Sequence, residues 1–476
     1  MLTSRREFLK TAALAPAILG AAPDTPPNVV FFICDQMRAD ALGALGGTNG
    51  RTPNLDRLAA QGVVFENSFS NNPVCVPSRK SMWTSLYPHQ HGSLTNRDGD
   101  MLELANSMPG YFKQRGYRVG YAGKNHAFTK QAMGAFDMAS VRDREPFREY
   151  NQWVPPYWHC DSYWPAEQTY AHLNTEDALR FLAARDRTPF FLTVSYFDPH
   201  PPYMAPAEYT SRYTSRQMRL PEFIPPKTLS PRLEEYYRAL RFDRVTDADL
   251  TETMRYYHAA IEWGVDHQVG RILAEIEKRG ALDNTIIVFT SDHGDFMGEQ
   301  RIAGKGMFLA ESLLRVPTIW RVPGMRAGRK SADLVQGIDI FPTLVELTGG
   351  KRGEEWMGRS LKPALEGASR QDASHAIFTS AGYGELEKEI LDENSELHRT
   401  SELPLHTRVM NRNVRPAHKT SLLRTREWKM ILSETQPPEL YRMNGGWVER
   451  ENAAGNAQAA GVSRGLEQRL QQWWKW

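Results

Sequence analysis

Residues 28–36 read NVVFFICDQ, an apolar run that ends at once in an acid and an amide. A short run of Val, Ile and Phe with little polar alternation is typical of a strand buried on both faces of a parallel sheet. Three later runs share this pattern of an apolar strand followed by chemically active side chains. They are YRVGYA (117–122) before GKNH, FFLTVSYF (190–197) before DPH, and TIIVFT (285–290) before SDHGD.

Helical patterns lie between these runs. A helix is predicted to open at Thr52-Pro53-Asn54, with Thr52 as its cap and Pro53 in the first turn, and to close at Gly62. A long amphipathic helix is predicted over residues 252–279. Strands alternating with helices indicate a doubly wound α/β fold, in which ligands bind beyond the carboxyl ends of the strands. We therefore expect the four polar clusters to meet at one edge of the sheet and form an active site.

The length of 476 residues is too great for one ordinary core and predicts two domains. The pattern changes after about residue 370. Residues 384–420 are polar and irregular, and they are followed by strand patterns in 422–433 and 439–442 and a terminal helix in 466–474. We predict a large α/β domain over 27–370 and a smaller α+β domain over 371–476. The net charge of +2 argues against a nucleic-acid partner, which would favour a basic excess.

The first 22 residues have the layout of an export signal. Arg5-Arg6 precede an apolar stretch, 11–19, and the small residues Gly20-Ala21-Ala22. The paired arginines resemble a twin-arginine signal, whereas the alternative is a basic helix that frays. The signal predicts a bacterial protein that folds before the twin-arginine machinery exports it to the periplasm or beyond. No other apolar run approaches the length of a membrane span.

The three cysteines are an odd number, so at least one is unpaired or chemically used. Their spacing suits neither a zinc cluster nor a disulfide framework. Cys75 opens the strongest local motif, CVPSR (75–79), and Pro77 onward is predicted to form a helix whose amino end favours an anion. Cys75 could instead be a small buried hydrophobe. It could also be a phosphatase thiolate, although the arginine of a phosphatase loop lies farther along the chain than Arg79. Cys34 is expected only to pack.

The CVPSR motif resembles the C-x-P-S-R sequence of the type I, formylglycine-dependent sulfatases, a family of the alkaline phosphatase superfamily. The resemblance covers nearly the whole chain, with two departures: Met82-Trp83-Thr84-Ser85 replaces the family's L-x-T-G, and Arg442 replaces an Asp. Its further motifs are TPNLDRL (52–58), GKNH (123–126), PHPPY (199–203), SDHG (291–294), GKG (304–306) and PELY (438–441).

The resemblance implies a large, mostly parallel sheet sandwiched by helices, as in alkaline phosphatase, with a smaller C-terminal α+β domain. It implies that the formylglycine-generating enzyme oxidises Cys75 to formylglycine. One divalent cation would be held by Asp35, Gln36, modified Cys75, Asp292 and His293. Oxygen ligands favour Ca²⁺ or Mg²⁺, and the histidine makes Mn²⁺ an alternative; we predict Ca²⁺. The two aspartates could alternatively cap helices that follow the strands.

The family mechanism gives further residues roles. Arg79 would hold formylglycine and the metal ligands, while Lys124 and Lys305 would contact sulfate. A hydrated aldehyde at position 75 would attack sulfur, and His200, with Lys305, would protonate the leaving alcohol. His126 would then take a proton from the remaining hydroxyl as sulfate leaves. A thiol or serine could not follow this route because its sulfated intermediate has no geminal hydroxyl.

The predicted function is hydrolysis of a sulfate monoester on a carbohydrate or aryl group. The alternatives are a phosphonate monoester or phosphodiester hydrolase, and a non-catalytic anion- or glycan-binding homologue. Substrate recognition stays open. The aromatic residues of 150–170 could stack on sugar or aryl rings, or pin a loop to the core. The basic part of 384–420 could reach an anionic substrate, or simply be solvated.

Overall fold

The computed structural model describes residues 26–96, 100–142, 159–184, 187–223, 242–368, 375–382, 419–434, 436–443 and 448–473, with a few single residues between these ranges. The predicted signal, 1–22, lies outside the described residues. So do most of the irregular segment 384–420 and the first half of the aromatic segment 150–170.

The four predicted strands form the centre of an eight-stranded sheet. They are β1 (Asn28–Cys34), β3 (Arg118–Gly123), β6 (Phe190–Ser195) and β8 (Thr285–Ser291). These strands are adjacent, in the order β8-β1-β6-β3, and all are parallel. Their carboxyl ends therefore meet at one edge, as predicted. The sheet is completed by β2 (Val63–Phe69), β4 (Met138–Val141), β9 (Thr318–Arg321) and β10 (Arg329–Gln336), in the order β10-β2-β9-β8-β1-β6-β3-β4.

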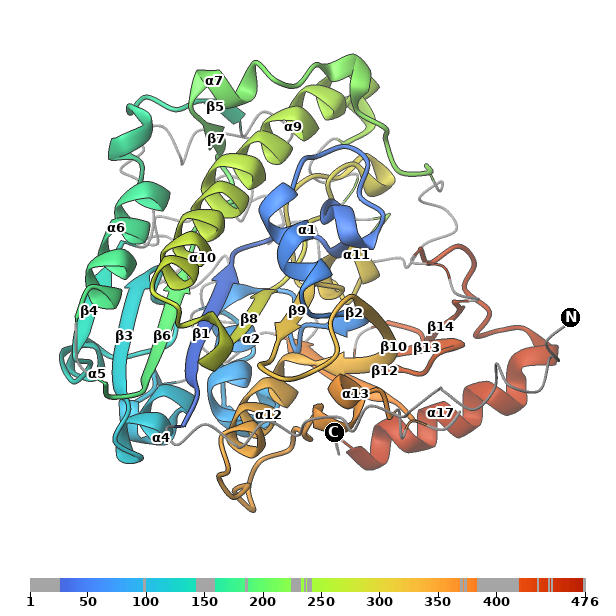
Figure 1. Cartoon of the computed structure of the whole chain (residues 1–476). Helices are drawn as coiled ribbons and strands as arrows, with labels where there is room; N and C mark the ends of the chain where they lie inside the picture. Colours follow the sequence, from blue (N-terminus) through green and yellow to red (C-terminus); the bar gives the residue numbers. More distant parts are fainter. Residues whose placement is uncertain are drawn as a thin grey trace, which may run out of the picture.

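Helices cover both faces of this sheet (Figure 1). Val30 and Phe32 of β1 belong to one core, which includes α1 (Pro53–Ala60), α6 (Tyr170–Leu182) and α10 (Gln268–Lys278). Phe31, between them, belongs to the opposite core, which includes α2 (Cys75–Thr84), α4 (Met108–Gln114) and α12 (Ile340–Leu347). Burial on both faces explains the unbroken apolar sequence of β1. Among the described strands of this sheet, only β9 runs antiparallel to its neighbours, so the predicted mixed, mostly parallel sheet is confirmed.

The start of α1 differs from its prediction. Pro53 lies in the first turn as expected, but the Thr52 side chain does not cap the helix. The Thr52 hydroxyl instead accepts a hydrogen bond from the Gly43 amide at 2.9 Å. Asp266, which is distant in the sequence, caps the helix instead. Its carboxylate accepts hydrogen bonds from the backbone amides of Asn54 and Leu55. A cap supplied across the fold leaves no local sequence signal.

The predicted helix over 252–279 is interrupted. It consists of α9 (Asp247–Ala260), a π-helical segment (Ile261–His267) and α10. It begins earlier than predicted because Thr246 and Asp249 form a capping box. Gly264, inside the π-helical segment, lies so close to Asp198 that an added Cβ would come within 2.3 Å of its carboxyl carbon.

The predicted small antiparallel sheet and terminal helix are present near the C-terminus. The sheet comprises β11 (Ile377–Gly382), β12 (Lys419–Arg424), β13 (Trp428–Ser433) and β14 (Glu439–Arg442), and α17 (Ala460–Trp473) packs against it. The stretch 422–433 thus spans two strands and their turn. The boundary at residue 370 stays a prediction. Shorter elements are α3 (Pro88–His91), α5 (Lys130–Gly134), α7 (Ala207–Thr210), α11 (Glu311–Leu314), α13 (Lys362–Glu366), β5 (His159–Asp161) and β7 (Tyr203–Ala205).

A buried ionic cluster joins the small sheet to the large domain. Glu311 of α11 accepts Arg424 Nε at 3.1 Å and lies 3.5 Å from Lys429 Nζ, and all three side chains are almost fully buried. Lys429 also pairs with Glu449. Because a buried charge is costly without its partner, these pairs tie the two parts together.

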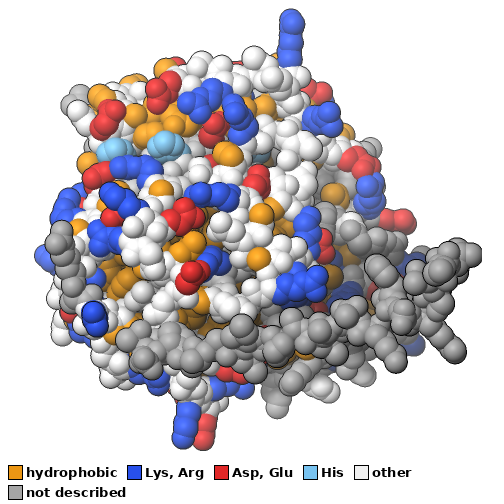
Figure 2. Space-filling model, viewed as in Figure 1, with side chains coloured by type: hydrophobic (Ala, Val, Ile, Leu, Met, Phe, Trp, Pro, Cys, Tyr) orange, Lys and Arg blue, Asp and Glu red, His pale blue; other side chains and the backbone are white. Residues whose placement is uncertain are grey.

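The described surface matches the balanced composition. In the view of Figure 2, positive and negative side chains are interspersed over α6, α9 and α10 rather than gathered by sign. None of the helices within the described ranges is both long and apolar enough to cross a bilayer.

Candidate active site

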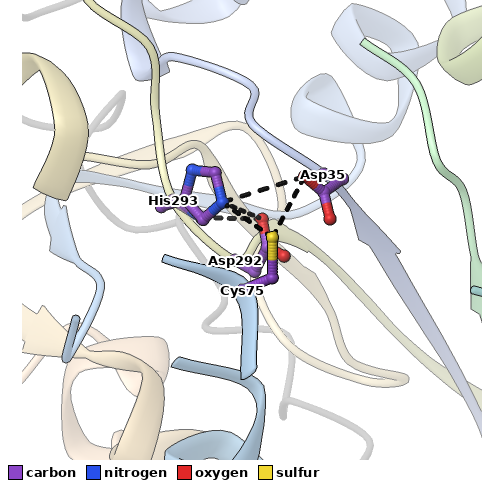
Figure 3. A group of neighbouring side chains, drawn as sticks. All are labelled: Asp35, Cys75, Asp292 and His293. Atoms are coloured by element: carbon purple, nitrogen blue, oxygen red, sulfur yellow. Dashed lines mark hydrogen bonds and ion pairs between the residues drawn. The ribbon is translucent and has the colours of Figure 1, made fainter. Parts of the chain in front are cut away.

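Four side chains from three distant segments converge at the carboxyl edge of the sheet (Figure 3). Asp35 directly follows β1, Asp292 and His293 directly follow β8, and Cys75 is the first residue of α2. One ligand atom of each lies within 4.8 Å of the others. Cys75 Sγ is 3.3 Å from His293 Nε2 and 3.7 Å from Asp35 Oδ1. All four are at most 1% exposed, so this is an enclosed polar cluster.

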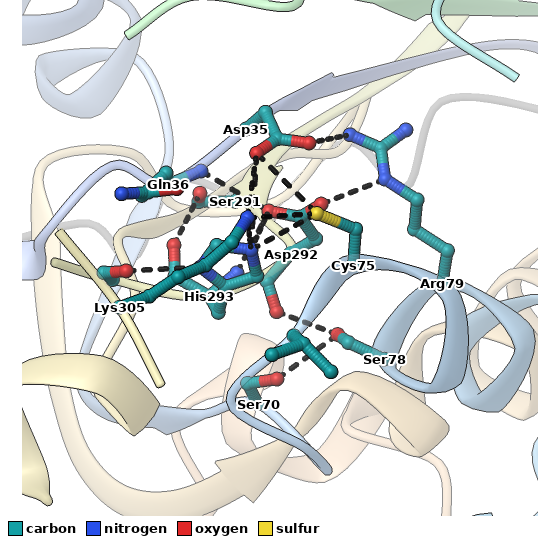
Figure 4. Close-up of polar contacts among 12 residues, drawn as sticks. Asp35, Gln36, Ser70, Cys75, Ser78, Arg79, Ser291, Asp292, His293 and Lys305 are labelled. Atoms are coloured by element: carbon teal, nitrogen blue, oxygen red, sulfur yellow. Dashed lines mark hydrogen bonds and ion pairs between the residues drawn. The ribbon is translucent and has the colours of Figure 1, made fainter. Parts of the chain in front are cut away.

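Arg79 organises the two carboxylates (Figure 4). It lies one helical turn after Cys75, on the same face of α2, and is fully buried. Its Nε donates to Asp292 Oδ2 at 2.7 Å and its Nη2 to Asp35 Oδ2 at 3.1 Å. The Nη1 atom donates to Ser195 Oγ at 2.8 Å. The guanidinium therefore fixes both acids at once, and their charges offset its burial.

Two lysines bring positive charge to Cys75. Lys124 Nζ lies 2.6 Å from Asp35 Oδ2 and 3.8 Å from Cys75 Sγ. Lys305 Nζ lies 3.0 Å from Cys75 Sγ and 3.1 Å from His293 Nε2. Burial and the Asp35 carboxylate raise the pKa of the Cys75 thiol, but the two lysines and His293 outweigh them and hold it well below its ordinary value. The site thus favours a negative group at position 75.

Two histidines complete the surroundings of Cys75. Burial and the adjacent Lys124 lower the pKa of His126, and the nearby Cys75 side chain opposes this shift. Burial and Lys305 hold the pKa of His200 well below its usual range. His200 Nδ1 lies 2.7 Å from the Pro201 carbonyl oxygen, which can only accept a hydrogen bond. Nδ1 therefore carries the proton in the neutral ring, and Nε2 is an acceptor.

Gln36 has an unusual backbone and an unmatched side-chain oxygen. Its φ of 70° is rare for a residue other than glycine. Its backbone amide donates to Asp292 Oδ1 at 3.1 Å, and its Nε2 donates to Asp295 Oδ2 at 2.6 Å. Gln36 Oε1 is buried and accepts no hydrogen bond. Buried polar atoms normally have a partner, so a buried amide oxygen that accepts no hydrogen bond is a candidate metal ligand.

The donor set fits a divalent cation. Asp35, Asp292 and Gln36 offer oxygen atoms, and His293 offers Nε2, since its Nδ1 lies 2.9 Å from the Gly294 carbonyl oxygen. Burial and the neighbouring Asp35 carboxylate raise the pKa of Asp292, because two buried acids so close together repel each other when both are ionised. A bound cation would relieve this repulsion. Oxygen-rich ligation with one imidazole suits Ca²⁺, Mg²⁺ or Mn²⁺.

All the site residues predicted from the sequence come together in this region. Sequence reasoning missed three supporting residues: Ser195, which accepts from Arg79, and Asp295 and Tyr203, which support Gln36. Each lies at or beside a quoted motif, but nothing in the motifs indicates its partner. Of the aromatic segment, Tyr163 and Trp164 are described and are 63% and 38% exposed. The basic residues of segment 384–420 that could reach an anionic substrate, His406, Arg408, Arg412 and Arg415, lie outside the described ranges.

The fold and this buried site define a hydrolase of the alkaline phosphatase superfamily. Residues 27–350 match the family model described as "Sulfatase". The chain belongs to the sulfatase family, whose members hydrolyse sulfate esters.

Several known proteins are similar to this chain. The chain is 29% identical to the multifunctional alkaline phosphatase superfamily protein PehA of Trinickia caryophylli, over 72% of this chain and 77% of PehA. It is 29% identical to an arylsulfatase of Clostridium perfringens, over 71% and 78% of the two chains. The phosphonate monoester hydrolase SpPMH of Silicibacter pomeroyi shares the fold, with a TM-score of 0.76, 23% identity and coverage of 93% and 94%.

Proposed function

We propose that the protein hydrolyses a sulfate monoester, of a carbohydrate or an aryl alcohol, with a nucleophile formed by oxidising Cys75 to formylglycine. One observation carries the proposal. Cys75 lies within 4 Å of buried Lys124, of half-buried Lys305 and of candidate metal ligands, in a site that favours negative charge at position 75. A structural cysteine would need none of these cations.

We infer that one divalent cation, with Ca²⁺ as the leading candidate, is bound by Asp35, Gln36, Asp292 and His293 together with modified Cys75. When bound, the ion would supply Lewis-acid stabilisation of negative oxygen. Arg79 would keep Asp35 and Asp292 ionised and oriented toward it. An aldehyde at position 75 would supply, after hydration, the hydroxyl nucleophile.

Lys124 and Lys305 would bind the terminal oxygens of the sulfate. The Nζ atom of Lys124, directly after β3, lies 3.8 Å from Cys75 Sγ, and that of Lys305, in the 304–306 loop, lies 3.0 Å from it. Fixed cations in an enclosed site stabilise charge that develops on these oxygens in the transition state, without reorganising water. Their closeness to Cys75 Sγ supports a role in holding a sulfate group that reacts with residue 75.

The histidines would move protons at the two ends of the reaction. Binding of an anionic sulfate beside His200 raises the proton affinity of its ring, so that Nε2 can carry a proton to the leaving oxygen. Lys305 would assist, since its ammonium group is close enough to His200 to lower the pKa of the ring. His126, whose pKa the Cys75 side chain influences, would accept the proton released there when sulfate departs.

The rival function is hydrolysis of a phosphonate monoester, favoured by the likeness to SpPMH and by the neutral ligand Gln36. A phosphonate carries a carbon substituent where a sulfate ester has a terminal oxygen. Sites built to hydrogen bond an oxygen discriminate against a group that lacks it. We therefore expect a larger kcat/KM for an aryl sulfate than for an aryl phosphonate bearing the same phenol, measured in parallel. Faster phosphonate cleavage would overturn the sulfatase proposal in favour of its rival.

We also propose that residues 1–22 are a twin-arginine signal and that the mature enzyme acts in the periplasm or outside the cell. Export of a folded chain would require the formylglycine-generating enzyme to oxidise Cys75 in the cytoplasm, before the helix α2 that contains it is buried. Cell fractionation of the full chain tests this, since a variant with Arg5→Lys and Arg6→Lys should stay in the cytoplasm. Equal export of the two chains would contradict it.

A further inference from the structure

We infer that Asp295 is a positioning residue that sets which end of the Gln36 carboxamide faces the metal. The inference rests on the proposed metal site. Asp295 is fully buried, and its Oδ2 accepts Gln36 Nε2 at 2.6 Å. The amide nitrogen is thereby fixed on Asp295, so Oε1 must point away from it. Oε1 is the atom that the structure leaves buried without a donor.

The orientation depends on Asp295 being an acceptor at Oδ2. A glutamine side chain presents an oxygen and a nitrogen at nearly the same place, and only the surrounding hydrogen bonds decide which is which. A carboxylate can only accept, so it selects the nitrogen. Tyr203 donates its hydroxyl to the same Oδ2 at 2.7 Å and holds the carboxylate in place.

The other oxygen of Asp295 supports the loop that carries Lys305. Asp295 Oδ1 accepts the backbone amides of Met297 at 2.8 Å and Gly304 at 3.0 Å. One carboxylate thus joins the end of β1, the segment after His200 and the loop that leads to Lys305. The two oxygens have separate tasks, and a substitution can therefore alter one and spare the other.

The Gln36 backbone is held as firmly as its side chain. Its positive φ is strained for a residue other than glycine, so the surroundings must enforce it. Tyr257 donates its hydroxyl to the Gln36 carbonyl at 3.1 Å and accepts the Arg38 amide at 2.9 Å. Together with the hydrogen bond from the Gln36 backbone amide to Asp292, these contacts fix the position of the Gln36 backbone. Asp295 then fixes the orientation of the carboxamide at the end of the side chain.

Asp295→Asn tests the orientation directly. The introduced carboxamide keeps an oxygen for the two loop amides but replaces Oδ2 with a donor. Gln36 must then turn its own oxygen toward that donor and its NH₂ toward the ion. We expect the affinity for Ca²⁺ or Mn²⁺, whichever the native protein binds more tightly in calorimetric titration, to fall about 10–100-fold. Gln36→Ala should lower it similarly.

The double variant Gln36→Glu with Asp295→Asn provides a rescue. The carboxamide introduced at position 295 would donate to one oxygen of the carboxylate introduced at position 36. The other carboxylate oxygen would face the ion where Gln36 Oε1 had been. Binding should return to within about tenfold of the native affinity.

Asp339→Asn is the matched control for these variants. Asp339 is also a buried acid that accepts two backbone amides, from Gln336 and Arg359. It lies outside the group of candidate metal ligands, so its substitution should leave metal affinity unchanged.

The outcomes distinguish failure of the proposed metal site from failure of the positioning role of Asp295. If the native protein binds none of the tested ions, the proposed metal site itself is wrong. If the native protein binds and Asp295→Asn binds equally well, only the positioning role is wrong. Loss in the single variant without recovery in the folded double variant would also overturn it, since Asp295 would then act by some route other than the Gln36 amide.

Discussion

Cys75→Ala should reduce kcat/KM for an aryl sulfate on the order of 10⁶-fold, the scale seen when a hydrolase loses its covalent nucleophile. Alanine removes only one sulfur atom from a fully enclosed site, so the fold should persist. Lys124 and Lys305 would still be available to bind an anion. Turnover should therefore collapse while binding of the product sulfate, measured by calorimetry, survives.

Cys160→Ala is the control for this variant. Cys160 lies in β5 and is half-buried, outside the cluster of Asp35, Cys75, Asp292 and His293. Its loss should leave kcat/KM within a few-fold of native. Substantial turnover by Cys75→Ala, measured with protein free of other sulfatases, would mean that another group is the nucleophile.

His200→Asn should produce a loss that depends on the leaving group. An alkyl or sugar alcohol needs a proton as it departs, whereas an acidic phenol departs as an anion. We expect kcat/KM to fall on the order of 10²–10⁴-fold for an alkyl sulfate and much less for a nitrophenyl sulfate. The measurement is the pair of kcat/KM values for the native and variant enzymes.

His172→Asn provides the comparison, because His172 lies on α6 beside Glu176 and Arg271 rather than near Cys75. Both substrates should be hydrolysed at native rates. If His200→Asn slowed the two substrates equally, His200 would be holding the sulfate or the local fold instead of supplying the proton.

The sequence predicted the centre of the fold because the evidence for it is local. Each central strand, such as β1 or β8, is an unbroken apolar run followed by polar residues, and parallel strands necessarily bring those polar ends together. The motifs then named Asp35, Cys75 and Asp292 as neighbours. The structure brings them within 4.8 Å of one another, His293 included.

What the sequence could not predict depends on contacts across the fold. Thr52 is an ordinary capping residue, yet Asp266 caps α1 from more than two hundred residues away. The π-helical segment inside the long helix has no periodic signal of its own. Asp295 is simply the next acid after a metal motif until its bond to Gln36 is seen. These features arise from pairings between distant segments, which composition and periodicity do not encode.

The mass of the peptide that contains position 75, from protein produced with the formylglycine-generating enzyme, tests the central claim most directly. We expect the mass of an aldehyde or its hydrate at residue 75, with Cys34 and Cys160 remaining as thiols in the same sample. An unmodified Cys75 in protein that turns over a sulfate ester would contradict the proposed nucleophile. An unmodified Cys75 in inactive protein would instead favour an anion- or glycan-binding homologue.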